Sequence, residues 1–289
     1  MKTFKPDQNL LQAMKNKIIA VKVGGNALTD DRIIDRIISQ IAALKELGLM
    51  PVVIHGGGIE IKDLLSKVGI ESEFIGGHRK TDTAAMTYIE MALSGGVNKE
   101  IVRRLSLKGI LAVGISGKDG RLATAKRRVH IEEVDGNPIE IDLGNVGDVS
   151  EINPGVVHTL IESGYVPVIS PVSTGEDGLT YNVNADMFAG HIAAAIKAER
   201  FIALTNIDGL LKEINDPGSL IENLTPEMCK KLYGTVIMGG MIPKMDACLF
   251  SVENGVKRAH IINGLHSDSL LRILLTKDKL GTTISADQG

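Results

Sequence analysis

Tryptophan is absent from this 289-residue chain, and aromatic residues make up only 3% of it. So few rings exclude a stacking platform for nucleic-acid bases. The net charge of −3 also argues against broad nucleic-acid binding. The only two cysteines, Cys229 and Cys248, have neither metal-ligand nor C-x-x-C spacing, so we expect reduced thiols.

Long apolar runs are also missing. None reaches the ~18 residues of a membrane span, so we expect no membrane partner. The first 17 residues lack the continuous apolar core of a secretory signal, which predicts a cytoplasmic protein. The seven histidines are scattered without ligand spacing, and we expect no metal held by side chains.

What the chain does contain is a series of short apolar runs rich in β-branched residues. They occupy residues 18–23, 51–54, 111–115, 166–169, 201–204 and 259–262. Segments with helical periodicity separate them. This alternation predicts an α/β fold with an open, mainly parallel sheet sandwiched between helices.

One segment breaks the alternation. Residues 121–143 contain short runs separated by turn residues such as Asp135 and Gly136, which predicts an inserted β-hairpin. A boundary between two lobes is expected near residues 197–200, where a helical pattern ends before the fifth apolar run. It would divide the chain into residues 1–197 and 198–289.

Two of the expected strands end in glycine-rich segments. The run at 51–54 is followed by His55 and Gly56–Gly58, and a helical pattern then begins. Glycines here bare N–H groups at a helix N-terminus, where an anion is well received. The first strand ends at Lys22, just before Gly24 and Gly25. Because parallel strands end at the same edge of a sheet, we predict one small-anion site, although Lys22 alone could be a solvated strand-end lysine.

Three further segments could complete such a site. Arg79 could clamp a carboxylate through two hydrogen bonds, or lie on a solvated loop. Asn182 and Asp186 flank Asn184, a plausible N-cap of a helix expected to start at Met187, and could serve a ligand or only the cap.

Lys244 follows a glycine pair and a proline at an expected helix start. A cation in that first turn opposes the helix dipole, which favours a role in binding phosphate.

Read in order, the segments KVGG, HGGG, GxRxTD, NVNAD, TNIDG and GGMIPK, between residues 22 and 244, resemble the acetylglutamate kinases of the amino acid kinase family. Each segment is weak alone, whereas the ordered series is specific and covers nearly the whole chain. The resemblance implies ATP-dependent phosphorylation of the side-chain carboxylate of N-acetyl-L-glutamate, the second step of arginine biosynthesis. It also implies Mg²⁺ held by the nucleotide phosphates and water.

The resemblance assigns roles to individual residues. Lys22 and Lys244 would stabilise the transition state, and Asp186 would orient them. Substrate would be held by Gly57, Gly58, Arg79 and Asn182. The nucleotide site would comprise Gly24, Gly25, Asn206, Ile207, Asp208, Gly209, Leu210, Leu211, Val236, Ile237 and Met238. The N-terminal lobe would bind the acyl amino acid and dimerise, and the C-terminal lobe would bind ATP.

Elementary chemistry is consistent with these roles. A carboxylate with an ordinary pKa of ~4.3 is ionised at neutral pH, so it attacks phosphorus without a general base. The reaction instead needs positive charge to bring two anions together and to stabilise the transferring phosphoryl group.

Several alternatives stay open. A related acylamino-acid kinase acting on a carrier-linked aminoadipate could use Lys126, Arg127 and Arg128, on the expected hairpin, to receive the carrier. A non-catalytic amino-acid sensor on the same fold is a third possibility. The chain is expected to form a homodimer, or a hexamer through an N-terminal helix bearing Leu10, Leu11 and Met14.

Inhibition by arginine is an open hypothesis. The C-terminal segment partly resembles the arginine-sensitive pattern, but Arg272 stands where an acidic residue would receive the effector. His78 and Asn206 also depart from the family pattern, beside the expected substrate and nucleotide sites.

Overall fold

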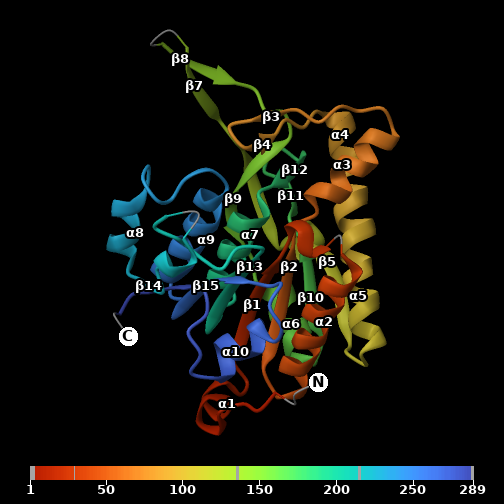
Figure 1. Cartoon of the computed structure of the whole chain (residues 1–289). Helices are drawn as coiled ribbons and strands as arrows, with labels where there is room; N and C mark the ends of the chain where they lie inside the picture. The colour runs from red at the N-terminus through yellow and green to blue at the C-terminus, as the bar shows by residue number, and fades with distance from the viewer. Residues whose placement is uncertain (1–3, 29, 135–136, 214–215, 288–289) are drawn as a thin grey trace.

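One eight-stranded sheet forms the centre of the molecule (Figure 1). The structure is a computed structural model that describes residues 4–28, 30–134, 137–213 and 216–287. Its strands lie in the order β14 (Asn223–Leu224), β16 (Thr282–Ser285), β15 (Arg258–Asn263), β13 (Arg200–Thr205), β1 (Ile18–Val23), β2 (Met50–His55), β10 (Val166–Ser170) and β5 (Ala112–Ser116). Only the β15–β16 pair is antiparallel. The predicted mainly parallel sheet is confirmed, and all six predicted strands are present.

Helices cover both faces of this sheet because its central strands are apolar on both sides. One face packs against α6 (Gly155–Glu162), α7 (Ala185–Ala195), α8 (Pro226–Leu232) and α9 (Ile242–Glu253). The other packs against α1 (Gln8–Met14), α2 (Asp31–Glu46), α5 (Asn98–Leu107) and α10 (Ser269–Leu275). A smaller cluster joins α3 (Gly58–Lys67), α4 (Thr83–Glu90) and a π-helix, Met91–Val97. The burial of both sheet faces explains the unbroken apolar runs.

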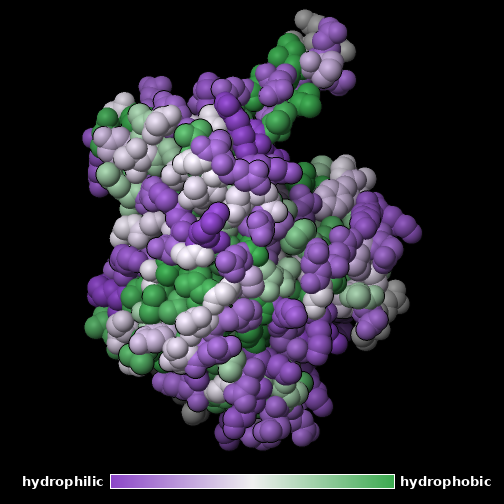
Figure 2. Space-filling view, turned by 180° about the vertical axis from the view of Figure 1, so that it is seen from behind, coloured by the Kyte–Doolittle hydropathy of each residue, from purple (hydrophilic) through white to green (hydrophobic). Residues whose placement is uncertain are grey.

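A second, smaller β-structure lies beside the main sheet. Strands β6 (Ala123–Arg127), β9 (Val146–Ile152), β11 (Val172–Gly175) and β12 (Thr180–Val183) close into a small barrel. A hairpin of β7 (His130–Val134) and β8 (Asn137–Ile141) projects from the body (Figures 1 and 2). The inserted hairpin is therefore confirmed, and its turn at Asp135 and Gly136 lies outside the described residues. The prediction was wrong in extending it to 121–127, because β6 pairs with β9 and β11 instead.

Short elements complete the chain. The two-stranded hairpin of β3 (Phe74–Ile75) and β4 (His78–Arg79) lies to the left of α3 and α4 in the view of Figure 1. Helix α1 packs on α10, with the Asp7 N–H donating to the Leu275 carbonyl at 2.8 Å. Met14 is buried and Leu11 packs on the same core, so this face of α1 is covered by its own chain.

The sheet runs without a break through both halves of the chain. Strand β1 pairs in parallel with β2 on one side and with β13 on the other. The division into lobes 1–197 and 198–289 therefore crosses a shared sheet, and it stays a prediction. No helix among the described residues has the length and apolar character needed to cross a membrane.

Candidate active site

Two lysines meet at one buried carboxylate. Lys22, one residue before the end of β1, lies 2.8 Å from one oxygen of Asp186, in the first turn of α7. Lys244, in the first turn of α9, donates to the other oxygen at 2.9 Å. Asp186 is only 7% exposed and Lys22 only 6%. Lys22, Asp186 and Lys244 stand in three separate sequence motifs, and the fold brings them into contact at Asp186.

The electrostatics of this cluster favour a fixed charge distribution. Burial by itself would raise the pKa of Asp186, but the ammonium groups of Lys22 and Lys244 outweigh that effect and lower it. The carboxylate therefore stays ionised at neutral pH and shares its two oxygens between the lysines. With one oxygen facing each lysine, Asp186 is suited to orienting the two ammonium groups.

The two glycine segments lie side by side at the carboxyl edge of the sheet. The Gly56 N–H donates to the Val23 carbonyl at 2.9 Å and so joins the ends of β1 and β2. Gly24 lies against the lysine, since a Cβ there would be 2.8 Å from Lys22 Nζ. The backbone next to the ammonium group is therefore kept free of side chains, as an anion cradle requires.

Gly57 and Gly58 occupy the helix N-terminus that the sequence predicted. Gly57 is the N-cap of α3, and the helix begins at Gly58 rather than Ile59. Arg79 reaches this point from β4, with Nη2 donating to the Gly58 carbonyl at 3.0 Å and Nη1 donating to Ser72 Oγ. Its guanidinium also lies 4.6 Å from the Phe74 ring centroid. Arg79 is 8% exposed, so the solvated-loop alternative is wrong.

Asn182 is placed by the β12–α7 unit. Its N–H donates to the Asn145 carbonyl at 2.9 Å, and its side chain is half-buried. Asn184 is the N-cap of α7, accepting from the Asp186 and Met187 N–H groups, as predicted. The helix begins at Ala185 rather than Met187. Asn182 therefore lies on the same strand–helix unit as Asp186.

A cavity of about 130 Å³ opens beside the lysines. It is lined by Lys22, Gly24, Gly25, Ala27, Leu204, Thr205, Asn206, Lys244 and Leu265. The cavity brings the lysine pair, the first glycine segment and the start of the expected nucleotide segment to one place.

The rest of the expected nucleotide segment divides into exposed and buried residues. Ile207 and Met238 are exposed, whereas Leu210 and Ile237 belong to the core. Asp208 accepts hydrogen bonds from Asn263 and His266, each at 2.7 Å, which lower its pKa. The remaining residues of the prediction hold this loop in place or adjoin it. A Cβ at Gly209 would be 2.8 Å from Thr282 Oγ1, and Leu211 pairs with Leu220. Val236 packs on the core.

The structure shows the contacts or burial of the three residues that depart from the family pattern. Arg272 is paired with Asp278 at 2.7 Å. His78 is half-buried, and burial lowers its pKa. Asn206 lines the cavity beside the lysines.

Within the part of the chain that the structure describes, no group of three or more His, Cys, Asp or Glu side chains could hold a metal ion.

Sequence reasoning missed two polar residues that support the site. Ser72 holds Arg79, and Asn98 is fully buried behind the glycine loop. Ser72 is only seven residues from Arg79, whereas Asn98 is 43 residues from His55 and 70 from Val168. The only local signal for Asn98 is the glycine pair Gly95 and Gly96 just before it, inside a helical pattern.

Comparison with known proteins agrees with this geometry. A model of the amino acid kinase family matches residues 17–263. The acetylglutamate kinase of Thermoanaerobacter pseudethanolicus is 44% identical over 278 residues, which cover 96% of this chain and 90% of the relative. That of Methanocaldococcus jannaschii is 42% identical over 279 residues, covering 96% and 93%.

Solved structures extend the likeness to the fold. The carbamate kinase from Giardia lamblia bound to AMP-PNP aligns with a TM-score of 0.67 at 15% identity, covering 94% of this chain and 99% of that one. Fold, sequence relatives and family model coincide, and the chain belongs to the amino acid kinase family, among its acetylglutamate kinases.

Proposed function

We propose that the protein transfers the terminal phosphoryl group of ATP to the side-chain carboxylate of N-acetyl-L-glutamate. The product is N-acetylglutamyl 5-phosphate, and the reaction is the second step of arginine biosynthesis. One observation carries the proposal: two ammonium groups meet at a single buried carboxylate in a chain 44% identical to an acetylglutamate kinase.

The lysines supply what this reaction needs. The substrate carboxylate is already ionised at neutral pH, so the site needs positive charge rather than a base. Lys22 and Lys244 would approach the transferring group from β1 and α9, and Asp186 would orient both. Preorganised charges of this kind stabilise the transition state because they do not reorganise during the reaction.

The remaining roles follow the same geometry. The N–H groups of Gly57 and Gly58 would bind the acyl amino acid, whose α-carboxylate would pair with Arg79 and whose acetyl group would lie toward Asn182. The nucleotide phosphates would occupy the cavity beside Gly24. The adenine would lie near the segment 206–211, and residues 236–238 would also line its site.

The cavity fits the phosphates of ATP, because Gly24 leaves the lysine ammonium open and Lys244 faces the same space. Mg²⁺ neutralises phosphate charge when it is bound. With Asp186 engaged by both lysines, we propose that the nucleotide phosphates and water hold it.

The organisation proposed for the whole protein is that of a cytoplasmic enzyme. Residues 1–197 would bind the acyl amino acid and dimerise, and residues 198–289 would bind ATP. A homodimer is proposed, with a hexamer through α1 as the larger alternative.

A carrier-linked aminoadipate is the rival substrate, and the structure offers it little support. Arg127 is paired with Asp142, and Arg128 is paired with Asp148. The basic patch that would receive a carrier is thus neutralised in part. A non-catalytic sensor would have no need of two lysines at Asp186.

A coupled assay of ADP release decides between these functions. We expect turnover with free N-acetyl-L-glutamate and much weaker turnover with a panel of other acyl amino acids and the carrier-linked substrate. The absence of ADP release with N-acetyl-L-glutamate would overturn the proposal.

A further inference from the structure

A π-helix interrupts the helical run behind the glycine loop. Residues Thr83–Leu107 form α4, the π-helix Met91–Val97 and α5 without a break. A π turn places one extra residue in the helix and shifts the side chains that follow it, and such turns occur often at functional sites. This one ends at Val97, directly before Asn98, so the register of Asn98 is set by the π turn.

The π-helix packs directly on the glycine loop. A Cβ at Gly57 would lie 2.8 Å from Leu93 Cδ2 and 3.1 Å from Val97 Cγ2. Ser94 Oγ lies 2.8 Å from Ser170 Oγ, at the carboxyl end of β10. The loop therefore lies against the π-helix, and a side chain at position 57 would have to displace Leu93 and Val97.

Asn98 connects the carboxyl ends of three strands. Its amide nitrogen lies 2.9 Å from the Val168 carbonyl of β10 and 3.2 Å from the Ile115 carbonyl of β5. It also lies 3.1 Å from His55 Nε2 at the end of β2. The amide has two hydrogens for three acceptors, so one hydrogen is shared. Both Asn98 and His55 are fully buried.

His55 carries this contact to the loop. Its Nδ1 lies 2.8 Å from the Gly56 carbonyl, so Nδ1 carries the proton and Nε2 accepts from Asn98. Burial lowers the pKa of His55 to about 4, which keeps the ring neutral and preserves this tautomer at neutral pH.

The Gly56 carbonyl and the Gly57 N–H belong to the same planar trans peptide, so they point in opposite directions. Holding the carbonyl therefore aims the N–H. We infer that His55 and Asn98 are positioning residues that direct the Gly57 N–H toward the substrate carboxylate. Neither touches substrate, and the inference rests on the proposed function, in which the N–H groups of Gly57 and Gly58 bind the acyl amino acid.

Two substitutions at His55 separate positioning from packing. In His55→Gln the longer side-chain amide can still accept from Asn98, but it loses the hydrogen bond to the Gly56 carbonyl. In His55→Asn the shorter amide can still donate to the Gly56 carbonyl, but it loses the hydrogen bond with Asn98. We expect His55→Gln and Asn98→Ala to raise KM for N-acetyl-L-glutamate about tenfold or more, the loss of one well-aimed hydrogen bond. KM for ATP should change less than about threefold in these variants. His55→Asn should raise KM for N-acetyl-L-glutamate less than His55→Gln does.

The matched control is Ser106→Ala, on the same helical run, where the hydroxyl bonds only its own helix at Val102. Hydrogen exchange at the Gly57 and Gly58 amides, measured in parallel, should rise in His55→Gln and Asn98→Ala and stay unchanged in the control. If Asn98→Ala fails to fold, the two His55 variants decide.

Two results separate the possible failures. Unchanged KM and unchanged amide exchange in His55→Gln, with only a lower melting temperature, would mean that the pair is structural and would overturn the inference. If the unmodified protein releases no ADP with N-acetyl-L-glutamate, the proposed function fails, and the amide exchange of the loop still tests the positioning.

Discussion

Asp186 shows at the scale of one residue how the site is preorganised. Its two oxygens face different lysines, one from β1 and one from α9, and its own helix begins just before it. A buried carboxylate without partners would be neutralised, whereas two ammonium groups keep it ionised. The charges that a phosphoryl group would meet are therefore fixed in the resting protein.

The first prediction concerns the two lysines. Lys22→Ala and Lys244→Ala should each lower kcat by roughly 10²–10³-fold, as the loss of one preorganised donor does, with a smaller change in KM. Steady-state kinetics with N-acetyl-L-glutamate and ATP measure this. Lys230→Ala, which removes only an exposed pair with Glu253, is the control. A kcat within twofold of the parent would remove that lysine from the mechanism.

The second prediction concerns Arg79. A lysine at this position has one ammonium in place of a planar fork, so it cannot hold Ser72 and the Gly58 carbonyl together. Arg79→Lys should therefore raise KM for N-acetyl-L-glutamate about tenfold to a hundredfold while KM for ATP stays near the parent value. Equal changes in both constants would contradict a specific role in substrate binding.

Residues differ in how well sequence predicts them. Lys22, Asp186 and Lys244 could be found because each stands in a short motif at a strand or helix end. Asn98 could not, since its partners lie 43 and 70 residues away and its place depends on a π turn. Only the fold brings such contacts together.

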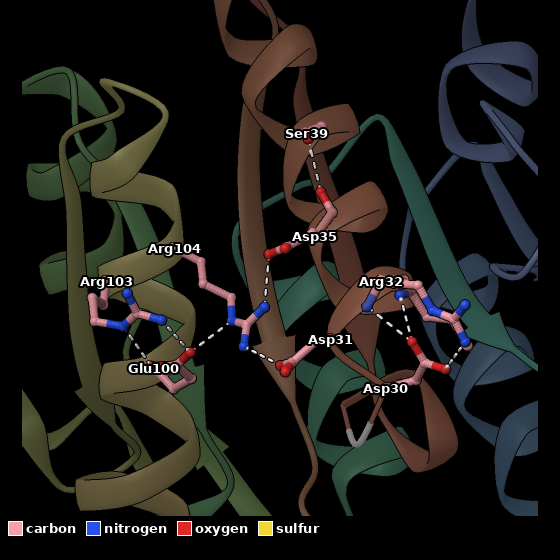
Figure 3. A network of polar contacts seen from close by, with 9 residues as sticks. Asp30, Asp31, Arg32, Asp35, Ser39, Glu100, Arg103 and Arg104 are labelled. Atoms are coloured by element: carbon pink, nitrogen blue, oxygen red, sulfur yellow. Dashed lines mark hydrogen bonds and ion pairs between the residues drawn. The ribbon is translucent and has the colours of Figure 1, made fainter.

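At the scale of elements, Arg104 links two helices (Figure 3). Its guanidinium, on α5, lies 2.5 Å from Asp31 and 2.7 Å from Asp35 on α2, and 2.7 Å from Glu100 on its own helix. The Arg104 side chain is only 13% exposed. Helix α2 follows the glycine segment of Lys22, so this link steadies the element that leads away from the site.

The third prediction follows from that link. Arg104→Ala leaves three carboxylates near one another with a single remaining cation, Arg103, beside Glu100. We expect it to lower the free energy of unfolding by about 1–3 kcal/mol, more than the ~0–1 kcal/mol of an exposed pair. Urea denaturation of Arg104→Ala and of the exposed-pair control Lys279→Ala measures the difference. An equal decrease in the free energy of unfolding in both variants would show that the Arg104 network stabilises the protein no more than an exposed ion pair does.

Elements also differ in predictability. Six of the eight strands of the main sheet can be predicted because burial on both faces makes them continuous apolar runs. The boundary of the hairpin was wrong because Ala123–Arg127 has the alternation of any half-buried strand, and pairing with β9 and β11 is decided by residues far along the chain.

At the scale of the whole molecule, one edge of the main sheet brings the lysine cavity and the glycine loop together. The carboxyl ends of β1, β2 and β13 lie side by side, which is where parallel sheets bind ligands. The lysine cavity and the glycine loop occupy that edge. Sequence could predict this edge from strand order along the chain, but not the spatial order of strands, since that order depends on long-range pairing.

The last prediction concerns the acid stability of the whole fold. Burial lowers the pKa of His55 to about 4 and that of His260 to about 3, both below the 6.5 of an unfolded histidine. The unfolded state therefore binds more protons below pH 6.5, so this contribution to stability is complete above pH 6.5 and is lost as pH falls toward 4. At pH 5 each histidine should cost about 2 kcal/mol, from 1.5 pH units at 1.36 kcal/mol each.

Urea denaturation at pH 7.5 and pH 5.0 measures this loss in the parent and in His260→Asn, whose amide can still bond Thr283. The window lies above the range in which ordinary carboxylates titrate, so the histidines dominate it. The variant should lose about 2 kcal/mol less than the parent between the two pH values. If the free energy of unfolding falls equally in the parent and in His260→Asn between pH 7.5 and pH 5.0, the pKa of His260 is not lowered in the folded state. This comparison does not depend on how stable the variant is at pH 7.5.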